Sequence, residues 1–198
     1  NVDTPVDKAL NDYLIGLEKS YPHADYITIN ISSPNTPGLR NLQFGEALDN
    51  LLSALKNRQA ELAEEFQRYV PMAVKVAPDL TLEEVQQLSE CFSRVGIDAV
   101  IATNTTLSRE AVAGLAHADE AGGLSGKPVF AKSTEIVRQF RQALPADMPI
   151  IAAGGIMSAE DAMQKLEAGA QLIQIYSGLI YQGPKLIQDI VKTIQKRR

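Results

Sequence analysis

Polar residues that could bind a ligand lie at or just after the ends of short apolar segments in this sequence. Asn30, Asn104 and Ser177 occupy such positions. A loop rich in Ser, Asn, Pro and Gly, residues 32–43, comes shortly after Asn30. An Asn amide presents a hydrogen-bond donor and an acceptor together, which suits a flat imide or amide ring. A Pro-stiffened turn without a ligand would use the same residue types. The loop alone leaves both interpretations open, and the repetition of the pattern in residues 104–106 favours ligand binding.

Lys75 is the one charged residue in an apolar segment, residues 72–76. A Lys in a strand that is buried on both faces needs an anionic or acceptor partner, because an unpaired buried charge is costly. A reduced flavin, which is negative along its N1/C2-carbonyl edge, would be such a partner. The alternative is a Lys near a strand end whose ammonium group reaches solvent. We favour the ligand interpretation, since a charged residue among apolar neighbours is more typical of a functional site.

Two Gly-containing turns follow the last two apolar segments. Gly154 and Gly155 come after residues 149–153, and Gly178 comes after residues 171–175. The last two βα loops of many barrel enzymes hold a phosphate group through backbone N–H groups. Glycines also occur in tight turns that bind nothing. Because both turns fall where a barrel would have its phosphate site, we favour phosphate binding.

Alternating strands and helices are needed to bring these residues together. Continuous apolar segments predict β-strands at residues 26–30, 72–76, 99–102, 149–153 and 171–175. Between these segments, apolar residues recur every three or four positions, which predicts helices. Continuous rather than alternating apolar strands indicate that both faces are covered, and strands that alternate with helices indicate a parallel sheet.

The ends of several helices carry recognisable signals. Thr81 and Glu84 have the spacing of a capping box, Gly96 follows that helix, and Ser158 is placed to cap a later one. Residues 4–5 are expected to begin the first helix, with Pro at its first position. We expect Val6 and Leu82 to point inward in their helices.

A doubly wound sheet and a (β/α)₈ barrel both contain this alternation. Polar residues at the carboxyl end of every strand favour the barrel, whose active site lies on that rim. A closed barrel has eight strands, whereas the sequence predicts about five. We therefore expect an α/β fold that is a partial (β/α)₈ TIM barrel lacking its first strands. Residues 1–198 would be the C-terminal portion of a single barrel domain, and the absence of Met at position 1 agrees with this.

Composition excludes several classes of function. The chain has 198 residues, 45% of them hydrophobic, and a net charge of −5, as expected of a globular domain without a basic surface for nucleic acid. The single cysteine, Cys91, excludes an internal disulfide and suits a reducing compartment. No apolar run reaches the ~18–20 residues of a membrane span. We expect no metal site.

Four segments carry a resemblance to one family. They are residues 30–40 (NISSPNTPGLR), 101–106 (IATNTT), 122–126 (GGLSG) and 175–178 (IYSG). In this order and spacing they closely resemble the dihydroorotate dehydrogenases, and Lys75, Gly154 and Gly155 also fall where that family has them. The resemblance extends over the whole chain, and the combination of motifs is far more specific than any one of them.

The resemblance implies roles for individual residues. Ser33 resembles the catalytic base of the membrane-associated, quinone-using branch, whereas the soluble branch has Cys at that position. A Ser hydroxyl is a poor base near pH 7, so it would need a proton relay, such as an ordered water or a neighbouring Thr. The residues that resemble orotate ligands are Asn30, Asn35, Asn104 and Thr105. Those that resemble FMN contacts are Asn30, Lys75, Thr103, Gly126, Gly155, Tyr176 and Ser177.

The resemblance also implies an activity. The family oxidises dihydroorotate to orotate in de novo pyrimidine synthesis, with FMN as hydride acceptor and, in this branch, a quinone as the final electron acceptor. It implies a peripheral location on the cytoplasmic side of the inner membrane, with contact only through an N-terminal helical segment. That segment, the first three strands and a second Lys near the substrate have no counterpart in this sequence. We expect the missing segment of the same protein to be a partner, and the fragment alone to be inactive.

Two other functions are compatible with parts of the sequence. Another FMN- or phosphate-binding barrel, such as a dihydrouridine synthase-like protein, would need a catalytic Cys and a basic RNA-binding surface, and the sequence indicates neither. A non-catalytic part of a barrel that serves as a scaffold would have no reason to concentrate Asn, Ser and Thr at its strand ends. The polar strand ends therefore favour the dehydrogenase.

Overall fold

Five parallel strands form one sheet in the part of the chain that the computed structural model describes, residues 4–5, 8–36 and 38–197. Each strand pairs with the next one along the chain. This sequential order is that of a barrel, whereas a doubly wound sheet changes direction part-way. The prediction of a partial (β/α)₈ barrel is confirmed. In order across the sheet, the strands are β1 (Ile27–Asn30), β2 (Met72–Val76), β3 (Ala99–Ala102), β4 (Ile150–Ala153) and β5 (Leu172–Gln174).

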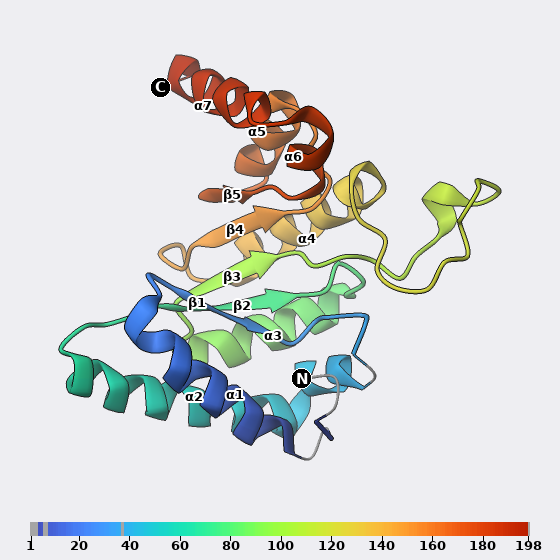
Figure 1. Cartoon of the computed structure of the whole chain (residues 1–198). Helices are drawn as coiled ribbons and strands as arrows, with labels where there is room; N and C mark the ends of the chain where they lie inside the picture. Colours follow the sequence, from blue (N-terminus) through green and yellow to red (C-terminus); the bar gives the residue numbers. More distant parts are fainter. Residues whose placement is uncertain (1–3, 6–7, 37, 198) are drawn as a thin grey trace.

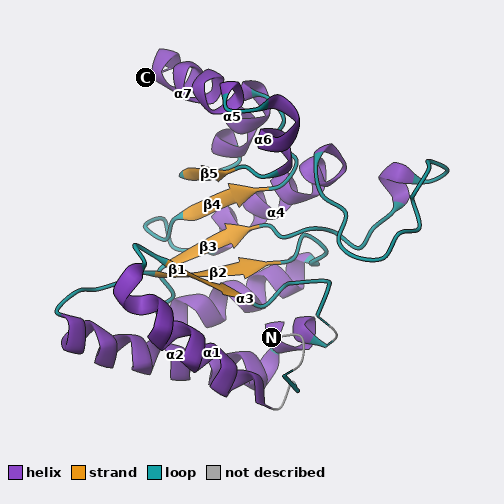
Figure 2. Ribbon diagram, in the orientation of Figure 1, coloured by secondary structure: helices purple, strands orange, loops and turns teal. Residues whose placement is uncertain are grey.

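Helices connect the strands and pack along one side of the sheet (Figures 1 and 2). The arrowheads of the strands point toward the same edge, and the long segment between β3 and α4 extends beyond that edge (Figure 1). The α-helices are α1 (Ala9–Ser20), α2 (Gly45–Phe66), α3 (Leu82–Val95), α4 (Phe130–Ala143), α5 (Ala159–Glu167), α6 (Ser177–Gln182) and α7 (Lys185–Arg197). Four 3₁₀ turns complete the described elements: η2 (Tyr21–His23), η3 (Leu39–Gln43), η4 (Glu110–Val112) and η5 (Lys127–Val129).

The two faces of the sheet are both apolar, as the continuous apolar strands predict. One face packs against the helices in the main core, which includes Val74 and Val100. The other face has its own small apolar cluster, formed by Ala73, Ala99, Ile101 and Ala153. Because side chains alternate along a strand, Lys75 lies on the same face as Ala73. This face is the interior of the barrel.

The register of the strands places Lys75 between two other interior positions. Asn30 of β1 and Ile101 of β3 are its Cα partners on either side. Paired residues of neighbouring strands point to the same face. Asn30 and Lys75 therefore share the interior face near the carboxyl edge of the sheet.

The predicted helix ends agree with the structure in three places. The Thr81 side chain accepts a hydrogen bond from the Glu84 amide (3.2 Å), and the Glu84 carboxylate accepts one from the Thr81 amide (2.7 Å), which is the complete capping box. Gly96 ends α3 with a φ of +79°, a backbone conformation that favours glycine. Ser158 caps α5 by accepting a hydrogen bond from the Asp161 amide at 3.1 Å.

Two details of the helix prediction need correction, and a third falls on a residue that the structure does not describe. The first helix begins at Ala9 rather than at residues 4–5, where a turn is closed by a hydrogen bond from the Lys8 amide to the Pro5 carbonyl (2.9 Å). Leu82 is 53% exposed, because it is the first residue of α3 and its side chain lies outside the stripe that packs on the core. Val6 lies outside the described residues.

Candidate active site

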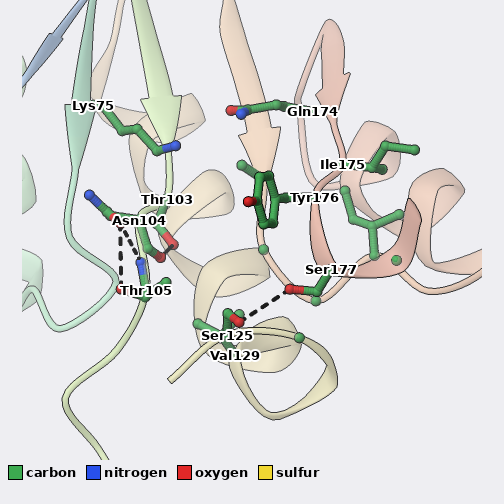
Figure 3. Close-up of a pocket in the computed structure, with 16 residues that line it drawn as sticks. Lys75, Thr103, Asn104, Thr105, Ser125, Val129, Gln174, Ile175, Tyr176 and Ser177 are labelled. Atoms are coloured by element: carbon green, nitrogen blue, oxygen red, sulfur yellow. Dashed lines mark hydrogen bonds between the residues drawn. The ribbon is translucent and has the colours of Figure 1, made fainter. Parts of the chain in front are cut away.

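A cavity of about 230 Å³ opens at the carboxyl edge of the sheet (Figure 3). Its walls come from the ends of β2, β3, β4 and β5 and from the segment that precedes α4. Figure 3 shows Lys75 and Thr103 on one flank, with Gln174 and Tyr176 on the other. Eight lining residues are ones for which the family resemblance implied a ligand role: Lys75, Thr103, Asn104, Thr105, Gly126, Gly155, Tyr176 and Ser177.

Asn30 is not among the residues that line the cavity, but its hydrogen bond with Asn104 connects the end of β1 to the end of β3. The Asn104 Nδ2 group lies 3.2 Å from Asn30 Oδ1 and 3.1 Å from Ser32 Oγ. Asn104 Oδ1 accepts a hydrogen bond from the Thr105 amide at 2.9 Å. Both ends of the Asn104 amide are thus oriented by the protein, and orientation of this kind prepares a polar side chain for ligand binding.

Ser32 has a role that its sequence position did not reveal. It is fully buried, and its hydroxyl donates to the Lys75 carbonyl at 2.7 Å in addition to its contact with Asn104. Sequence analysis assigned this loop serine no site role. Its hydroxyl joins the ends of β1, β2 and β3, so a substitution here would disturb Asn104 directly.

Ser33 and Asn35 lie in the loop after β1 and are not among the residues that line the cavity. The Ser33 hydroxyl accepts a hydrogen bond from the Asn35 amide at 3.3 Å. The tip of the loop packs against the segment before α4, since a Cβ atom on Gly123 would lie 2.7 Å from Pro34 Cγ and 1.8 Å from Thr105 Oγ1. Ser33 therefore sits in a loop that contacts Thr105, one of the cavity residues.

Asp79 joins four segments around the mouth of the site. Its carboxylate accepts hydrogen bonds from Arg40 (3.1 Å), Lys132 (2.8 Å), the Thr106 hydroxyl (2.5 Å) and the Leu107 amide (3.0 Å). Burial by itself raises the pKa of Asp79. The hydrogen bonds from Lys132, Thr106 and the Leu107 amide outweigh burial and hold this pKa below its ordinary value.

Arg40 extends the Asp79 contacts to the candidate substrate loops. Its guanidinium donates to the Ser32 carbonyl at 3.3 Å and to the Thr105 carbonyl at 3.1 Å. The Arg40–Asp79 ion pair is four-fifths shielded from solvent on both sides, so it is worth more than an exposed pair. Together the two side chains tie the loop after β1 to the loop after β3.

We expect Asp79→Asn to lower the thermal stability and to loosen both loops. A lost hydrogen bond to a charged group costs about 1.5–3 kcal/mol, which for a domain of this size lowers the Tm by roughly 3–12 °C. Because the pKa of Asp79 is lowered from 3.8 in the folded state, its stabilisation is present above that value and lost as the pH falls further. Calorimetry from about pH 2.5 to pH 7 measures this, since the pH-dependent part of the difference lies below 3.8. Asp147→Asn, an exposed substitution of the same kind, should leave the Tm unchanged, and an equal effect of both would contradict the assignment.

Lys75 brings to the cavity a positive charge that has no partner in the described part of the chain. It is half-buried, and burial lowers its pKa. Within the described residues, no hydrogen bond or ion pair involves its Nζ atom. An unpaired ammonium group on the interior face is costly unless an anion or acceptor binds beside it. The cavity therefore suits a ligand that is electron-rich near Lys75.

Main-chain atoms of two glycine turns form the opposite end of the cavity. A Cβ atom on Gly155, whose φ is +74°, would lie 2.5 Å from the Phe130 main chain, and one on Gly178 would lie 2.1 Å from the Ile156 carbonyl. Only glycine permits such close approach. The Ser177 and Ser125 hydroxyls are 3.2 Å apart beside these turns. Main-chain groups and hydroxyls around a cavity are suited to a phosphate group.

Six residues that line the cavity were not selected from the sequence: Ser125, Val129, Ala153, Ile156, Gln174 and Ile175. Gln174 had a usable signal, because it is a polar residue within an apolar strand, as Lys75 is. Ser125 belongs to the quoted segment 122–126, of which only Gly126 was selected.

The only cysteine of the chain lies away from the cavity. Cys91 is on α3, with its Sγ atom 3.1 Å from Asp49 Oδ1. Burial and this carboxylate raise the pKa of the Cys91 thiol to about 12. The thiol is therefore unsuited to act as a base at neutral pH.

The fold and the cavity define a class of protein. Parallel strands in sequential order, with a cavity at their carboxyl ends and a glycine-lined end suited to a phosphate, are the features of a cofactor-binding (β/α)₈ barrel. Comparison with known proteins specifies the family. The model of the family "Dihydroorotate dehydrogenase" matches residues 4–197, and the chain belongs to this family.

Relatives and solved structures support the assignment. The chain is 60% identical over 194 residues to dihydroorotate dehydrogenase (quinone) of Proteus mirabilis and 58% identical over 192 residues to that of Shewanella pealeana. These alignments cover 98% and 97% of this chain but 58% and 57% of the relatives. The ligand-free crystal structure of DHODH from Eimeria tenella superposes with a TM-score of 0.88 at 36% identity, covering 96% of this chain and 55% of that one. The chain thus spans a little over half the length of its relatives.

Two further observations concern membranes and metals. None of the described helices combines the length and apolar character needed to cross a bilayer. Among the described residues, no cluster of three or more His, Cys, Asp or Glu side chains is arranged to hold a metal ion.

Proposed function

We propose that the chain is the C-terminal portion of a single FMN-binding barrel domain that oxidises dihydroorotate to orotate. One observation carries the proposal. Six residues selected as FMN contacts line the same cavity, together with two selected as orotate ligands. They come from segments far apart in the sequence, and it is the folding of the chain that brings them together around one cavity. The names of the relatives support the same activity.

The residues of the cavity fit FMN at both ends. The phosphate group would be held by the main chain around Gly155 and by the hydroxyl of Ser177, and the ring would lie toward Lys75 and Thr103. Bound FMN supplies the hydride acceptor of the reaction. The unpaired ammonium group of Lys75 would stabilise negative charge on the reduced ring.

Asn30, Asn35, Asn104 and Thr105 would bind and orient the substrate. The amides of Asn30 and Asn104 are held 3.2 Å apart by their own hydrogen bond. Paired donor and acceptor groups match the flat ring and the carboxylate of orotate. Fixing this ring in one position is a large part of what such residues contribute to the rate.

Ser33 would be the base that removes the proton from C5 of dihydroorotate. Ser33 lies in the loop after β1, where its hydroxyl accepts a hydrogen bond from the Asn35 amide. Its neighbour Pro34 packs beside Gly123, which is also close to Thr105. A bound substrate and a closed loop would exclude water and leave the hydroxyl facing the ring. The proton then passes to a relay, for which an ordered water or a neighbouring Thr is suited.

A quinone would accept the electrons in the final step. The relatives of this chain are named for that acceptor. We place the protein on the cytoplasmic side of the inner membrane, in peripheral contact through an N-terminal segment of the kind that the quinone-using branch has.

The proposal is tested by the ligand content and turnover of the full-length protein. We expect one FMN per chain after purification, a change in flavin absorbance when orotate is added, and quinone reduction that depends on dihydroorotate. A scaffold built from the same fold would show no response to orotate. Protein that binds FAD instead, or oxidised flavin that dihydroorotate cannot reduce, would contradict the proposal.

A further inference from the structure

Lys165 on α5 is a fully buried lysine without an acidic hydrogen-bond partner among the described residues. Its Nζ atom lies 2.5 Å from the Ser133 hydroxyl and 3.2 Å from the Phe130 carbonyl, and 4.7 Å from the centre of the Phe130 ring. Burying a charge in this way is costly, and an apolar side chain of similar volume usually stabilises a protein as well or better. Packing alone therefore does not explain why a lysine occupies this position.

The charges around Lys165 do not neutralise it. Asp161, on the same helix, is bound by Lys127 at 2.7 Å and by the Met157 amide at 2.9 Å. Burial lowers the pKa of Lys165 to about 7; the Asp161 charge opposes this shift and the Lys127 charge adds to it. The ammonium group is thus poised to gain or lose its proton near neutral pH.

Charged groups on the neighbouring helices are engaged elsewhere. Arg141 of α4 donates to backbone carbonyls, including that of Met148 at 3.1 Å. Arg197 of α7 pairs with Glu167 at 2.6 Å and with Glu160 at 3.7 Å on the surface. Asp161 and Lys127 are therefore the charges that act directly on Lys165.

Ser133 connects Lys165 to the cavity. Its hydroxyl lies 3.1 Å from the carbonyl of Gly154, which lines the cavity. A hydroxyl has one proton to donate. The Ser133 proton has two acceptors within reach, the Phe130 carbonyl and the Gly154 carbonyl, each at 3.1 Å. Because Lys165 donates to the Ser133 oxygen and also to the Phe130 carbonyl, it competes for that carbonyl and favours donation by Ser133 to Gly154. Lys165 thus holds the Gly154 carbonyl in place through the Ser133 hydroxyl.

The next amide of the same turn points away from Ser133. In a trans peptide the N–H of Gly155 is directed opposite to the Gly154 carbonyl, which Ser133 contacts. Gly155 lines the cavity, and its main chain packs tightly against Phe130, which also accepts from Lys165. One ammonium group therefore holds both the start of α4 and the turn of Gly154 and Gly155.

We propose that Lys165 is a positioning residue for the ligand phosphate: through Ser133 it orients the turn of Gly154 and Gly155, and its buried positive charge favours a dianion in the cavity. This role rests on the proposed function in taking FMN as the ligand. Binding of the phosphate favours the protonated form of Lys165, so affinity and protonation are linked. The same charge does little for a flavin that lacks the phosphate.

The test compares FMN with riboflavin on the flavin-free full-length protein. We expect Lys165→Met to weaken FMN binding about tenfold at pH 7 and to leave riboflavin binding unchanged. Ser133→Ala keeps the lysine and removes the connection, and should reduce the preference for FMN in the same direction. Lys192→Met removes an exposed positive charge on α7 and is the control. If FMN and riboflavin weaken equally, or neither weakens, the proposal is wrong.

The pH dependence of FMN affinity gives a second test, because a lysine with a purely structural role would not change it. Since the phosphate is a dianion above its second pKa of about 6, its own titration contributes little between pH 7 and pH 9. Over that range we expect FMN affinity of the parent to fall up to about tenfold, because binding then requires proton uptake by Lys165. Lys165→Met should show a flat profile. A parent profile as flat as that of the variant would overturn the proposal.

Stability of the flavin-free protein separates positioning from packing. The pKa of Lys165 falls from 10.5 in the unfolded chain to about 7 on folding, so this group destabilises the fold most at and below pH 7 and less as the pH rises. We expect Lys165→Met to have a Tm equal to or above that of the parent at pH 7. A lower Tm together with equal losses for both flavins would assign Lys165 to packing.

Failure of the proposed function would be recognised separately. A parent protein that binds no flavin would contradict that function. Inorganic phosphate titrated against the parent and Lys165→Met would then decide the role of Lys165, with weaker binding expected for the variant and equal binding overturning the proposal.

Discussion

We expect flavin reduction by dihydroorotate to slow by ~10²–10⁴-fold when Ser33 is replaced by Ala in the full-length protein, because that is the usual cost of losing a general base, the role proposed for Ser33. The variant is expected to stay yellow and to bind orotate with nearly the affinity of the parent. This follows because the Ser33 hydroxyl accepts only a long hydrogen bond from the Asn35 amide (3.3 Å) among the described residues, while Asn30 and Asn104, the proposed substrate amides, keep the hydrogen bond between them. Stopped-flow absorbance in a single turnover measures the chemical step without the quinone reaction.

The control for Ser33 must leave the loop hydrogen bonds in place. Ser32→Ala, a natural first choice from the sequence, is unsuitable because the Ser32 hydroxyl contacts Lys75 and Asn104. Thr36→Val removes a hydroxyl from the same loop and should change the rate little. If Thr36→Val slows flavin reduction as much as Ser33→Ala does, damage to the loop explains both results. A Ser33→Ala variant that is reduced at the parent rate would show that another group takes the proton.

Replacing Lys75 with Met is expected to weaken FMN binding by about 10–100-fold, the effect of losing a hydrogen bond to a charged group of about 1.5–3 kcal/mol. The reduced flavin should lose more stabilisation than the oxidised one, since its ring carries the negative charge. The midpoint potential should therefore fall by tens of millivolts for this two-electron couple. Equilibrium dialysis and spectroelectrochemistry measure the two quantities.

Lys19→Met is the matched control for Lys75, because it removes an exposed lysine at the end of α1. It should leave both the FMN affinity and the potential unchanged. An unchanged affinity and potential in Lys75→Met would mean that the Lys75 ammonium group reaches solvent and has no part in flavin binding.

Much of the fold could be predicted because the signals are local. The apolar strands, the capping box of α3 and the Ser158 cap depend on residues a few positions apart. The convergence of Thr103, Gly155 and Tyr176 could also be predicted, since parallel strands present their carboxyl ends at one edge.

The contacts that orient the site could not be read from the sequence. Asp79 meets Arg40 and Lys132, and Lys165 meets Ser133, only because loops and helices far apart in the chain pack together. Their residue types are ordinary for surface loops and helices, and no spacing distinguishes them. The exposure of Leu82 was missed for a related reason: helical periodicity does not show where a helix leaves the core.

One measurement tests the central claim most directly. Flavin-loaded full-length protein is mixed with dihydroorotate in the absence of oxygen and of any other acceptor. The account predicts that the absorbance of the oxidised flavin disappears in a single turnover and that one orotate forms per flavin reduced. Flavin that stays oxidised, or is reduced without orotate being formed, would contradict it.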